Sequence, residues 1–186
     1  MTERTAVLLA MDFQNGIVER LGQPSVIEAA RQAVDTARTA GIPVMFVRVA
    51  FRPGYPEAAA TNAVFATIGQ AGNAMTEDHP ATQISIALAP RSDEPIVLKR
   101  RVSAFSSSDL DVLLRAAGAD TLILAGISTS GVVLSTLRQA ADLDYRLTVL
   151  SDACGDPDAE VHRVLTEKVF PRQARVTTTG EWIRDL

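Results

Sequence analysis

Short runs of apolar residues alternate along this chain with longer segments whose apolar residues recur at helical spacing. The apolar runs predict buried strands at residues 6–11, 44–49, 95–98, 121–125, 146–150 and 174–177. The segments between them predict helices at residues 26–40, 109–117, 132–141 and 159–170. Because continuously apolar strands that alternate with helices are typical of parallel sheets, we expect an α/β fold with helices on both faces of the sheet.

Length and charge narrow the class of protein. A chain of 186 residues fits one domain with a sizeable core, so we treat residues 1–186 as a single domain. Apolar residues make up 47% of the chain, which argues against disorder. The net charge is −4 and the basic run at residues 99–101 is short, so nucleic acids and anionic membranes are poor candidates for partners.

Cysteine and histidine are scarce. A single cysteine, Cys154, excludes an internal disulfide and a cysteine-based zinc site, and His79 and His162 lack metal-ligand spacing. We therefore expect no metal and no other cofactor. The N-terminus lacks a signal-peptide pattern, and no apolar run approaches the roughly 20 residues that span a bilayer, so we expect a soluble, cytoplasmic protein.

Residues 51–90 interrupt the alternation of strands and helices. They contain closely spaced prolines and glycines and one possible short helix at residues 63–69. Because a connection of this length in a compact domain usually has a function, we expect it to cover a site, with a solvated insertion as the alternative.

Polar residues follow the predicted strands at the points where ligands bind in open parallel sheets. They are Asp12, Arg48, Arg52, residues 99–101, residues 126–132, Asp152 and Cys154. Asp12 and Lys99 each follow an apolar run directly, so we expect an ion pair between neighbouring strand ends. Such a pair serves either catalysis or only the register of the strands.

Four stretches resemble the isochorismatase-like hydrolase superfamily, also called cysteine hydrolases. They are VLLAMDFQNGIV at residues 7–18, VLKRRVSAF at 97–105, LILAGISTSGVVLSTLRQAADLDY at 122–145 and LTVLSDAC at 147–154. The resemblance covers nearly the whole chain and implies a three-layer αβα, Rossmann-like fold with a six-stranded parallel sheet. It also implies a homodimer or higher homo-oligomer.

The resemblance assigns catalytic roles to Asp12 and Lys99. The cysteine nucleophile of the family falls on Val132, and a cis peptide bond falls between Ile127 and Ser128. Backbone N–H groups of this turn would then form an oxyanion hole. We assign oxyanion or substrate binding to five residues: Phe13, Gln14, Ser128, Thr129 and Val132.

Valine at position 132 closes the covalent route of the cysteine members, because it carries no nucleophile. We do not expect Thr129 or Ser130 to replace the missing nucleophile. Cys154 is better interpreted as a small buried apolar residue. Members that hydrolyse a vinyl ether also lack the cysteine, and their Asp acts as a general acid. For Asp12 this needs a pKa raised by burial, which the charge of Lys99 opposes.

Three functions remain open at this stage. The first is a hydrolase that acts on a small anionic metabolite through Asp12 and Lys99. The second is a catalytically silent member that binds a metabolite or a partner, and the third is an amidase that uses Cys154.

The pattern of the metal-binding nicotinamidases is missing after the second strand, where His79 stands alone. Three arginines could bind a substrate carboxylate or be solvated or ion-paired: Arg48, Arg52 and Arg101.

Overall fold

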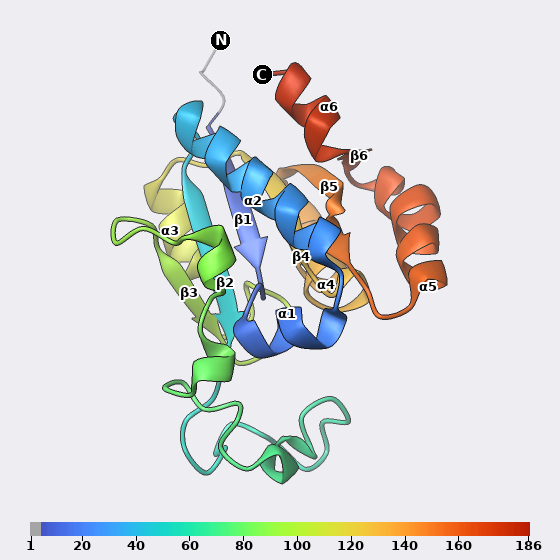
Figure 1. Ribbon diagram of the computed structural model, residues 1–186. Helices are drawn as coiled ribbons and strands as arrows, with labels where there is room; N and C mark the ends of the chain where they lie inside the picture. The colour runs from blue at the N-terminus through green and yellow to red at the C-terminus, as the bar shows by residue number, and fades with distance from the viewer. Residues whose placement is uncertain (1–4) are drawn as a thin grey trace.

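Six parallel strands form one sheet at the centre of the molecule, in the spatial order β3-β2-β1-β4-β5-β6 (Figure 1). The computed structural model describes residues 5–186. Its strands are β1 (Ala6–Met11), β2 (Val44–Val49), β3 (Ile96–Lys99), β4 (Thr121–Ile127), β5 (Arg146–Gly155) and β6 (Arg175–Thr177). The expected parallel sheet is confirmed. Strands β2 and β3 lie on one side of β1, and β4, β5 and β6 lie on the other, so the direction in which strands are added to the sheet reverses at β1.

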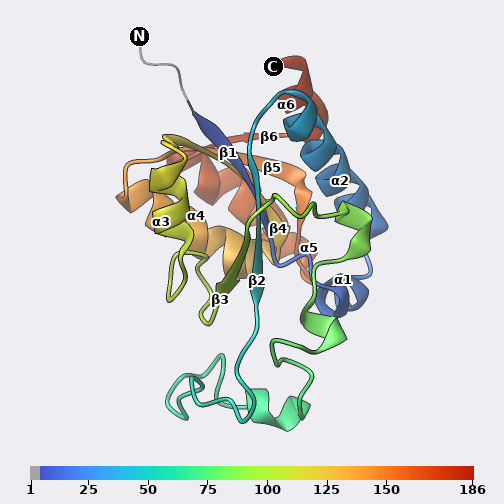
Figure 2. The ribbon, with the colours of Figure 1, turned by 90° about the vertical axis from the view of Figure 1, so that its left-hand side faces the viewer.

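Helices cover both faces of the sheet (Figure 2). They are α1 (Asn15–Leu21), α2 (Pro24–Thr39), α3 (Leu110–Ala116), α4 (Leu134–Asp142), α5 (Ala159–Val164) and α6 (Thr179–Arg184). Buried residues of α2 and α6 pack on one face, and those of α3 and α4 pack on the other. The three-layer αβα architecture expected from the sequence is therefore confirmed.

Side chains along β1 alternate between the two faces, as the pleat of a strand requires. Val7 and Leu9 join the cluster under α3 and α4, whereas Leu8 and Ala10 join the cluster under α2. All four are fully buried. Burial of a large aliphatic side chain stabilises a fold by about 1.5–3 kcal/mol. The two clusters thus fix β1 at the centre, and β1 in turn fixes the position of the residue that follows it.

The structure differs from the predicted elements mainly at their ends. Strand β5 runs to Gly155 rather than ending at residue 150, so Asp152 and Cys154 lie within it and not after it. The helix predicted at 132–141 begins with a π-helical turn, Thr129–Val133. The helix predicted at 159–170 continues past α5 as a π-helical turn, Leu165–Val169. Helices α1 and α6 were not predicted, because each is only one to two turns long.

The segment from residue 51 to 90 leaves the carboxyl end of β2. Figures 1 and 2 show its first part as the lowest part of the molecule, and its last part rises past α1 towards α2. It contains three short 3₁₀ turns, Ile68–Ala71, Pro80–Thr82 and Ile86–Leu88. Arg100, just after β3, holds the segment by ion pairs to Glu57 and Glu77, and donates to the carbonyl of Ala50 at 2.8 Å. The segment is therefore attached to the sheet edge by charged contacts.

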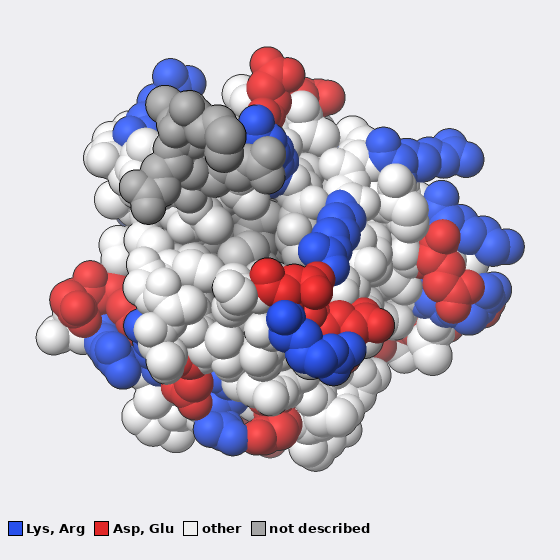
Figure 3. Space-filling model, turned by 90° about the horizontal axis from the view of Figure 1, so that it is seen from above, with Lys and Arg blue, Asp and Glu red and all other residues white. Residues whose placement is uncertain are grey.

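The surface at the amino ends of the strands carries mixed charge. In Figure 3, which views this end of the molecule, acidic and basic side chains lie among one another and neither sign forms a continuous patch. Among residues 5–186, no helix has the length and apolar character that crossing a bilayer requires.

Candidate active site

Asp12 stands where β1 ends and the chain turns towards α1. Its backbone φ is 58°, in the left-handed region that aspartate tolerates better than most residues. The Asp12 N–H donates to the carbonyl of Val47 at 2.8 Å, which holds this turn against β2. The side chain is 7% exposed. The backbone thus fixes a buried carboxylate at the carboxyl end of the central strand.

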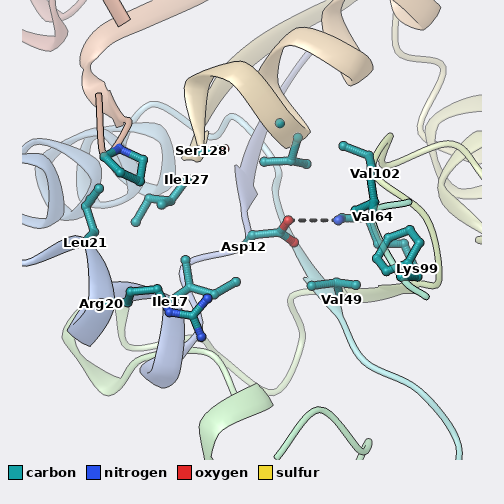
Figure 4. Close-up of a pocket in the computed structure, with 14 residues that line it drawn as sticks. Asp12, Ile17, Arg20, Leu21, Val49, Val64, Lys99, Val102, Ile127 and Ser128 are labelled. Atoms are coloured by element: carbon teal, nitrogen blue, oxygen red, sulfur yellow. Dashed lines mark ion pairs between the residues drawn. The ribbon is translucent and has the colours of Figure 1, made fainter. Parts of the chain in front are cut away.

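Lys99 ends β3 and pairs with Asp12, with Nζ 2.8 Å from Oδ2 (Figure 4). The lysine is 2% exposed and also donates to the carbonyl of Arg101 at 3.1 Å. The sequence predicted that these two strands are neighbours. That prediction is wrong, because β2 runs between β1 and β3. The long lysine side chain reaches past the end of β2 and bridges this gap.

Only one oxygen of the Asp12 carboxylate has a partner in the described chain. Oδ1 is buried and makes no hydrogen bond with any group in residues 5–186. Burial raises the pKa of Asp12 above its ordinary value, and the charge and hydrogen bond of Lys99 lower it by less. A carboxyl group with a raised pKa and a free oxygen can hold a proton and deliver it.

A cavity of about 360 Å³ lies against this ion pair. Figure 4 shows the Asp12 carboxylate at its centre, with Lys99 on one side and the turn at Ser128 on the other. Its polar lining comes from Asp12, Arg20, Lys99 and Ser128. Its apolar lining includes Ile17, Leu21, Val49, Phe65, Val102 and Val132. A small cavity that is mostly apolar and has a few convergent polar groups is typical of a ligand site.

The turn after β4 forms one wall of the cavity. The peptide bond between Ile127 and Ser128 is cis, as the resemblance implied. The carbonyl of Ser128 accepts hydrogen bonds from Gly131 and Val133, at 3.2 and 3.3 Å. The backbone N–H of Ser128, in contrast, has no acceptor within residues 5–186. That N–H is therefore available to an oxygen of a ligand.

Two glycines let this wall approach its neighbours closely. A Cβ at Gly131 would lie 2.7 Å from Oγ of Ser128. A Cβ at Gly126 would lie 2.9 Å from the carbonyl oxygen of Met11, the residue before Asp12. Real Cβ atoms do not approach other atoms so closely, so Gly126 needs glycine because its neighbour is backbone, whereas a Cβ at Gly131 would force the Ser128 hydroxyl to move.

Polar contacts fix the outer side of the turn. The N–H of Ser130 donates to Oδ2 of Asp156 at 2.8 Å, and Asp156 is 5% exposed. The hydroxyl of Thr129 lies 2.8 Å from Nδ1 of His162, on α5. Desolvation by burial lowers the pKa of His162, and the charge of Asp156 partly offsets this effect. His162, which the sequence analysis gave no role, thus braces the turn from behind.

Three residues assigned to substrate binding lie elsewhere. Phe13 is fully buried in the core under α2, because it follows Asp12 and points away from the cavity side. The amide of Gln14 donates to the carbonyls of Val49 and Thr82 and accepts from the N–H of Val49, which fully engages it. Thr129 is fully buried against His162. Ser128 and Val132, in contrast, line the cavity.

The three candidate arginines are engaged outside the cavity. Arg48 donates to the carbonyl of Glu77 at 2.9 Å. Arg52 pairs with Glu57 at 2.5 Å. Arg101 donates to the carbonyls of Arg100 and Glu57. None of the three lines the cavity, so they hold the segment at residues 51–90 rather than a ligand.

Cys154 does not share the cavity with Asp12. It lies within β5, is 2% exposed, and burial raises the pKa of its thiol to about 12. The thiol is therefore protonated near neutral pH, which removes the basis for an amidase that uses it. His79 accepts a hydrogen bond from the N–H of Ala81 and caps a 3₁₀ turn.

The sequence analysis missed the contribution of α1 to the cavity. Ile17, Arg20 and Leu21 share one side of this helix and line the cavity. Their spacing of three and four residues is a helical signal, and Gly22 ends the helix with a φ of 62°. Seven residues gave too little periodicity to separate α1 from the loop after β1.

Comparisons with known proteins agree with this architecture. Residues 6–181 match the isochorismatase domain. The uncharacterized isochorismatase family protein YecD of Escherichia coli O157:H7 is 32% identical over 190 residues, which cover 100% of this chain and 98% of YecD.

Two further relatives cover nearly the whole chain. A maleamate amidohydrolase of Pseudomonas putida strain KT2440 is 28% identical, over 98% of this chain and 87% of its own. An isochorismatase family protein from Desulfovibrio vulgaris subsp. vulgaris str. Hildenborough has a crystal structure that superposes with a TM-score of 0.88, at 25% identity and 98% coverage of both chains. The chain therefore belongs to the isochorismatase family of hydrolases.

Proposed function

We propose that this protein hydrolyses a small anionic metabolite by acid–base chemistry of Asp12 and Lys99, without a cysteine nucleophile. One observation carries the proposal: Oδ1 of Asp12 is buried, has no partner within residues 5–186, and belongs to a side chain that lines the cavity. An unpartnered buried carboxylate oxygen costs stability, so its retention at the centre of a cavity favours a role towards a ligand.

The first step uses Asp12 as a general acid. Burial raises the pKa of its carboxyl group, which favours the protonated form that the step requires. Asp12 donates its proton to the substrate atom that must gain one. Lys99, 2.8 Å from Oδ2, then stabilises the carboxylate that remains.

The second step uses water. Water adds to the electrophilic carbon of the substrate, and the Asp12 carboxylate takes a proton from that water. The adduct then collapses: the bond from that carbon to the leaving oxygen or nitrogen breaks, and the hydroxyl proton of the adduct passes to the leaving group. The free N–H of Ser128 would stabilise an oxygen on which negative charge develops. This sequence needs no covalent intermediate.

Val132 supports the absence of a covalent step. It lines the cavity beside Ser128, at the position that the family resemblance gives to the nucleophile. Its side chain supplies apolar surface and no reactive atom. Enol ethers and activated amides are the substrate classes that an acid and water can hydrolyse without a nucleophile. The relative named a maleamate amidohydrolase supports the inclusion of amides.

The same valine favours a second candidate function, a silent member that binds a metabolite. In that case the cavity remains and the chemistry is lost. The two candidates differ in turnover, so one enzymatic experiment separates them.

The test is hydrolysis of a small panel by the wild-type protein, beside Asp12→Asn. The panel holds isochorismate, maleamate, nicotinamide, a carbamoyl amine and a cyclic imide. We expect turnover of at least one compound, lost by about a hundredfold or more in Asp12→Asn, because general acid–base catalysis contributes about 10²–10⁴-fold. Asp93→Asn, at an exposed position outside the cavity, is the matched control. Turnover that survives Asp12→Asn contradicts the mechanism, and no turnover on any compound favours the silent member.

A further inference from the structure

Arg20 is a cation of the cavity without a partner. It lies in the last turn of α1 and lines the cavity that holds Asp12. Within residues 5–186 its guanidinium makes no hydrogen bond and no ion pair. Figure 4 draws the side chain as it extends from α1 towards the middle of the view, below Asp12.

The other cations at this end of the sheet are already engaged. Lys99 is bound by Asp12 and by the carbonyl of Arg101. Arg100 pairs with Glu57 and Glu77, and Arg48 donates to a backbone carbonyl. Among the described residues that line the cavity, Arg20 is therefore the one positive charge left for a ligand.

The surroundings of Arg20 specify the rest of the ligand. Ile17 and Leu21 flank it on the same helix, and Val64, from the segment at residues 51–90, lies across the cavity near Lys99 (Figure 4). An apolar wall of this kind favours a hydrocarbon body and disfavours a strongly hydrated one. The planar guanidinium fork matches the two oxygens of a carboxylate.

We propose that Arg20 binds the carboxylate of the ligand and selects acids with an apolar body, while Asp12 faces the opposite, reacting end. This inference deepens the proposed function, since it takes the cavity as the substrate site. It assigns a specificity-determining residue and a substrate class: small carboxylic acids whose remaining atoms are mainly hydrocarbon.

An ordinary explanation exists for an arginine at this position. A cation in the last turn of a helix interacts favourably with the helix dipole. Arg184 occupies the same place in α6, also exposed, and does not line the cavity. Arg184→Gln is therefore a matched control for Arg20→Gln, because it also removes one positive charge from the last turn of a short helix.

The experiment measures binding by calorimetry, with benzoate and benzamide as a pair of equal size that differs in charge. Inorganic phosphate serves as an anion without an apolar body. We expect the wild-type protein to bind benzoate more tightly than benzamide or phosphate. In Arg20→Gln the benzoate affinity should fall about tenfold and the benzamide affinity should stay unchanged, because one charge-assisted contact is lost. In Arg184→Gln neither affinity should change.

Salt gives a second readout. Arg20 is exposed, so its attraction for benzoate should weaken as ionic strength rises. Arg20→Gln should lose most of this salt dependence. Three results would overturn the proposal: equal benzoate affinity in the wild type and Arg20→Gln, an equal loss in Arg184→Gln, or no preference of the wild type for benzoate over both benzamide and phosphate.

Binding separates this proposal from the proposed function, because it requires no turnover. The same titrations in Asp12→Asn should retain the preference for benzoate over benzamide. If hydrolysis is absent but Arg20→Gln still weakens benzoate, the mechanism fails and the carboxylate site stands. If hydrolysis depends on Asp12 but Arg20→Gln binds benzoate normally, the mechanism stands and the role of Arg20 fails.

Discussion

Lys99 contacts only one of the two carboxylate oxygens of Asp12. Its Nζ lies 2.8 Å from Oδ2, whereas Oδ1 is buried without a partner among residues 5–186. A pair that served only to join two strands would gain from a second hydrogen bond, because a buried charge needs all its partners to offset desolvation. The asymmetry leaves one oxygen for a ligand and ties the other to the cation.

Removal of Lys99 should destabilise the fold strongly. Lys99→Met leaves the Asp12 carboxylate buried without its cation, and we expect a loss of about 3 kcal/mol in the free energy of unfolding near neutral pH. The loss should shrink in acid, where Asp12 accepts a proton. Urea unfolding at about pH 8 and about pH 5 measures both effects. Lys168→Met, at an exposed position, is the control. Equal losses in the two variants would contradict a buried pair.

Asp12 should make the protein less stable as pH rises. Its pKa is higher in the folded state than in the unfolded chain, because burial raises it more than Lys99 lowers it. Above about pH 4, where an ordinary aspartate ionises, Asp12 loses its proton in the unfolded chain but keeps it in the folded protein. The free energy of unfolding therefore falls as pH rises, until the pH exceeds the pKa of Asp12 in the folded protein. Asp12→Asn removes this contribution.

We therefore expect Asp12→Asn to become more stable relative to the wild type as pH rises above about 4, in urea titrations across the pH range. Asp93→Asn should show no such trend, since that side chain is exposed. A stability difference that stays constant with pH would count against the raised pKa of Asp12.

Val132→Cys should place a reactive thiol in the cavity. In the wild type the single thiol, Cys154, is buried with a pKa raised to about 12, so labelling by a disulfide reagent should be slow in the folded state. Valine and cysteine are similar in volume, so the fold should tolerate the exchange within about 1.5 kcal/mol. Val132 is as buried as Cys154, each 2% exposed, but it lines the cavity, so we expect the additional thiol to label faster than Cys154.

The matched control for that variant is Val133→Cys. Val133 belongs to the same turn but is fully buried in the core under α3 and α4. Its thiol should label as slowly as Cys154. Equal labelling rates in the two variants would mean that position 132 does not face the cavity in solution.

His162 should make the protein sensitive to mild acid. Burial lowers the pKa of His162 below the ordinary histidine value of about 6.5. Below about pH 6.5 the unfolded chain takes up a proton that the folded protein does not, so stability falls until the folded pKa is reached. In the protonated imidazole Nδ1 can only donate, so its contact with the Thr129 hydroxyl would then require the hydroxyl oxygen to accept.

The check is the midpoint of urea unfolding between about pH 7.5 and about pH 5. His162→Asn should remove most of the acid loss, whereas His79→Asn should keep it. The sequence contains these two histidines only, which makes the comparison complete. If the loss of stability in acid persists in His162→Asn, carboxylates rather than His162 are responsible for it.

The sequence predicted the parts of the site that depend on chain direction. Residues 6–11 of β1 and residues 96–98 of β3 are continuously apolar, so the polar residue that follows each run, Asp12 or Lys99, falls at the carboxyl edge of the sheet. The residues next to Asp12 could not be assigned the same way. Phe13 and Gln14 follow it directly but leave the cavity side, because Asp12 takes a left-handed conformation that redirects the chain.

The cavity lining that comes from outside the strands was not predictable. Arg20 reaches the cavity because α1 folds back beneath β1, and a helix of seven residues has little periodicity to reveal it. Val64 and Phe65 come from the segment at residues 51–90, which follows no regular pattern. Their positions depend on long-range contacts such as the pair of Glu57 with Arg100.

The reacting groups of the cavity and its outer wall come from different stretches of the sequence. Asp12 and Lys99 stand at the ends of strands that the core holds rigidly, whereas Val64 and Phe65 stand on a long connection held by the ion pairs of Arg100 with Glu57 and Glu77. Residues 80–85 bond directly to residues 13–15, beside the acid, and are tied to its position. Insertions and deletions between Glu57 and Glu77 can accumulate without moving the acid or its ammonium partner. Over evolutionary time, such a division lets a lineage acquire new substrates while it inherits the chemistry unchanged.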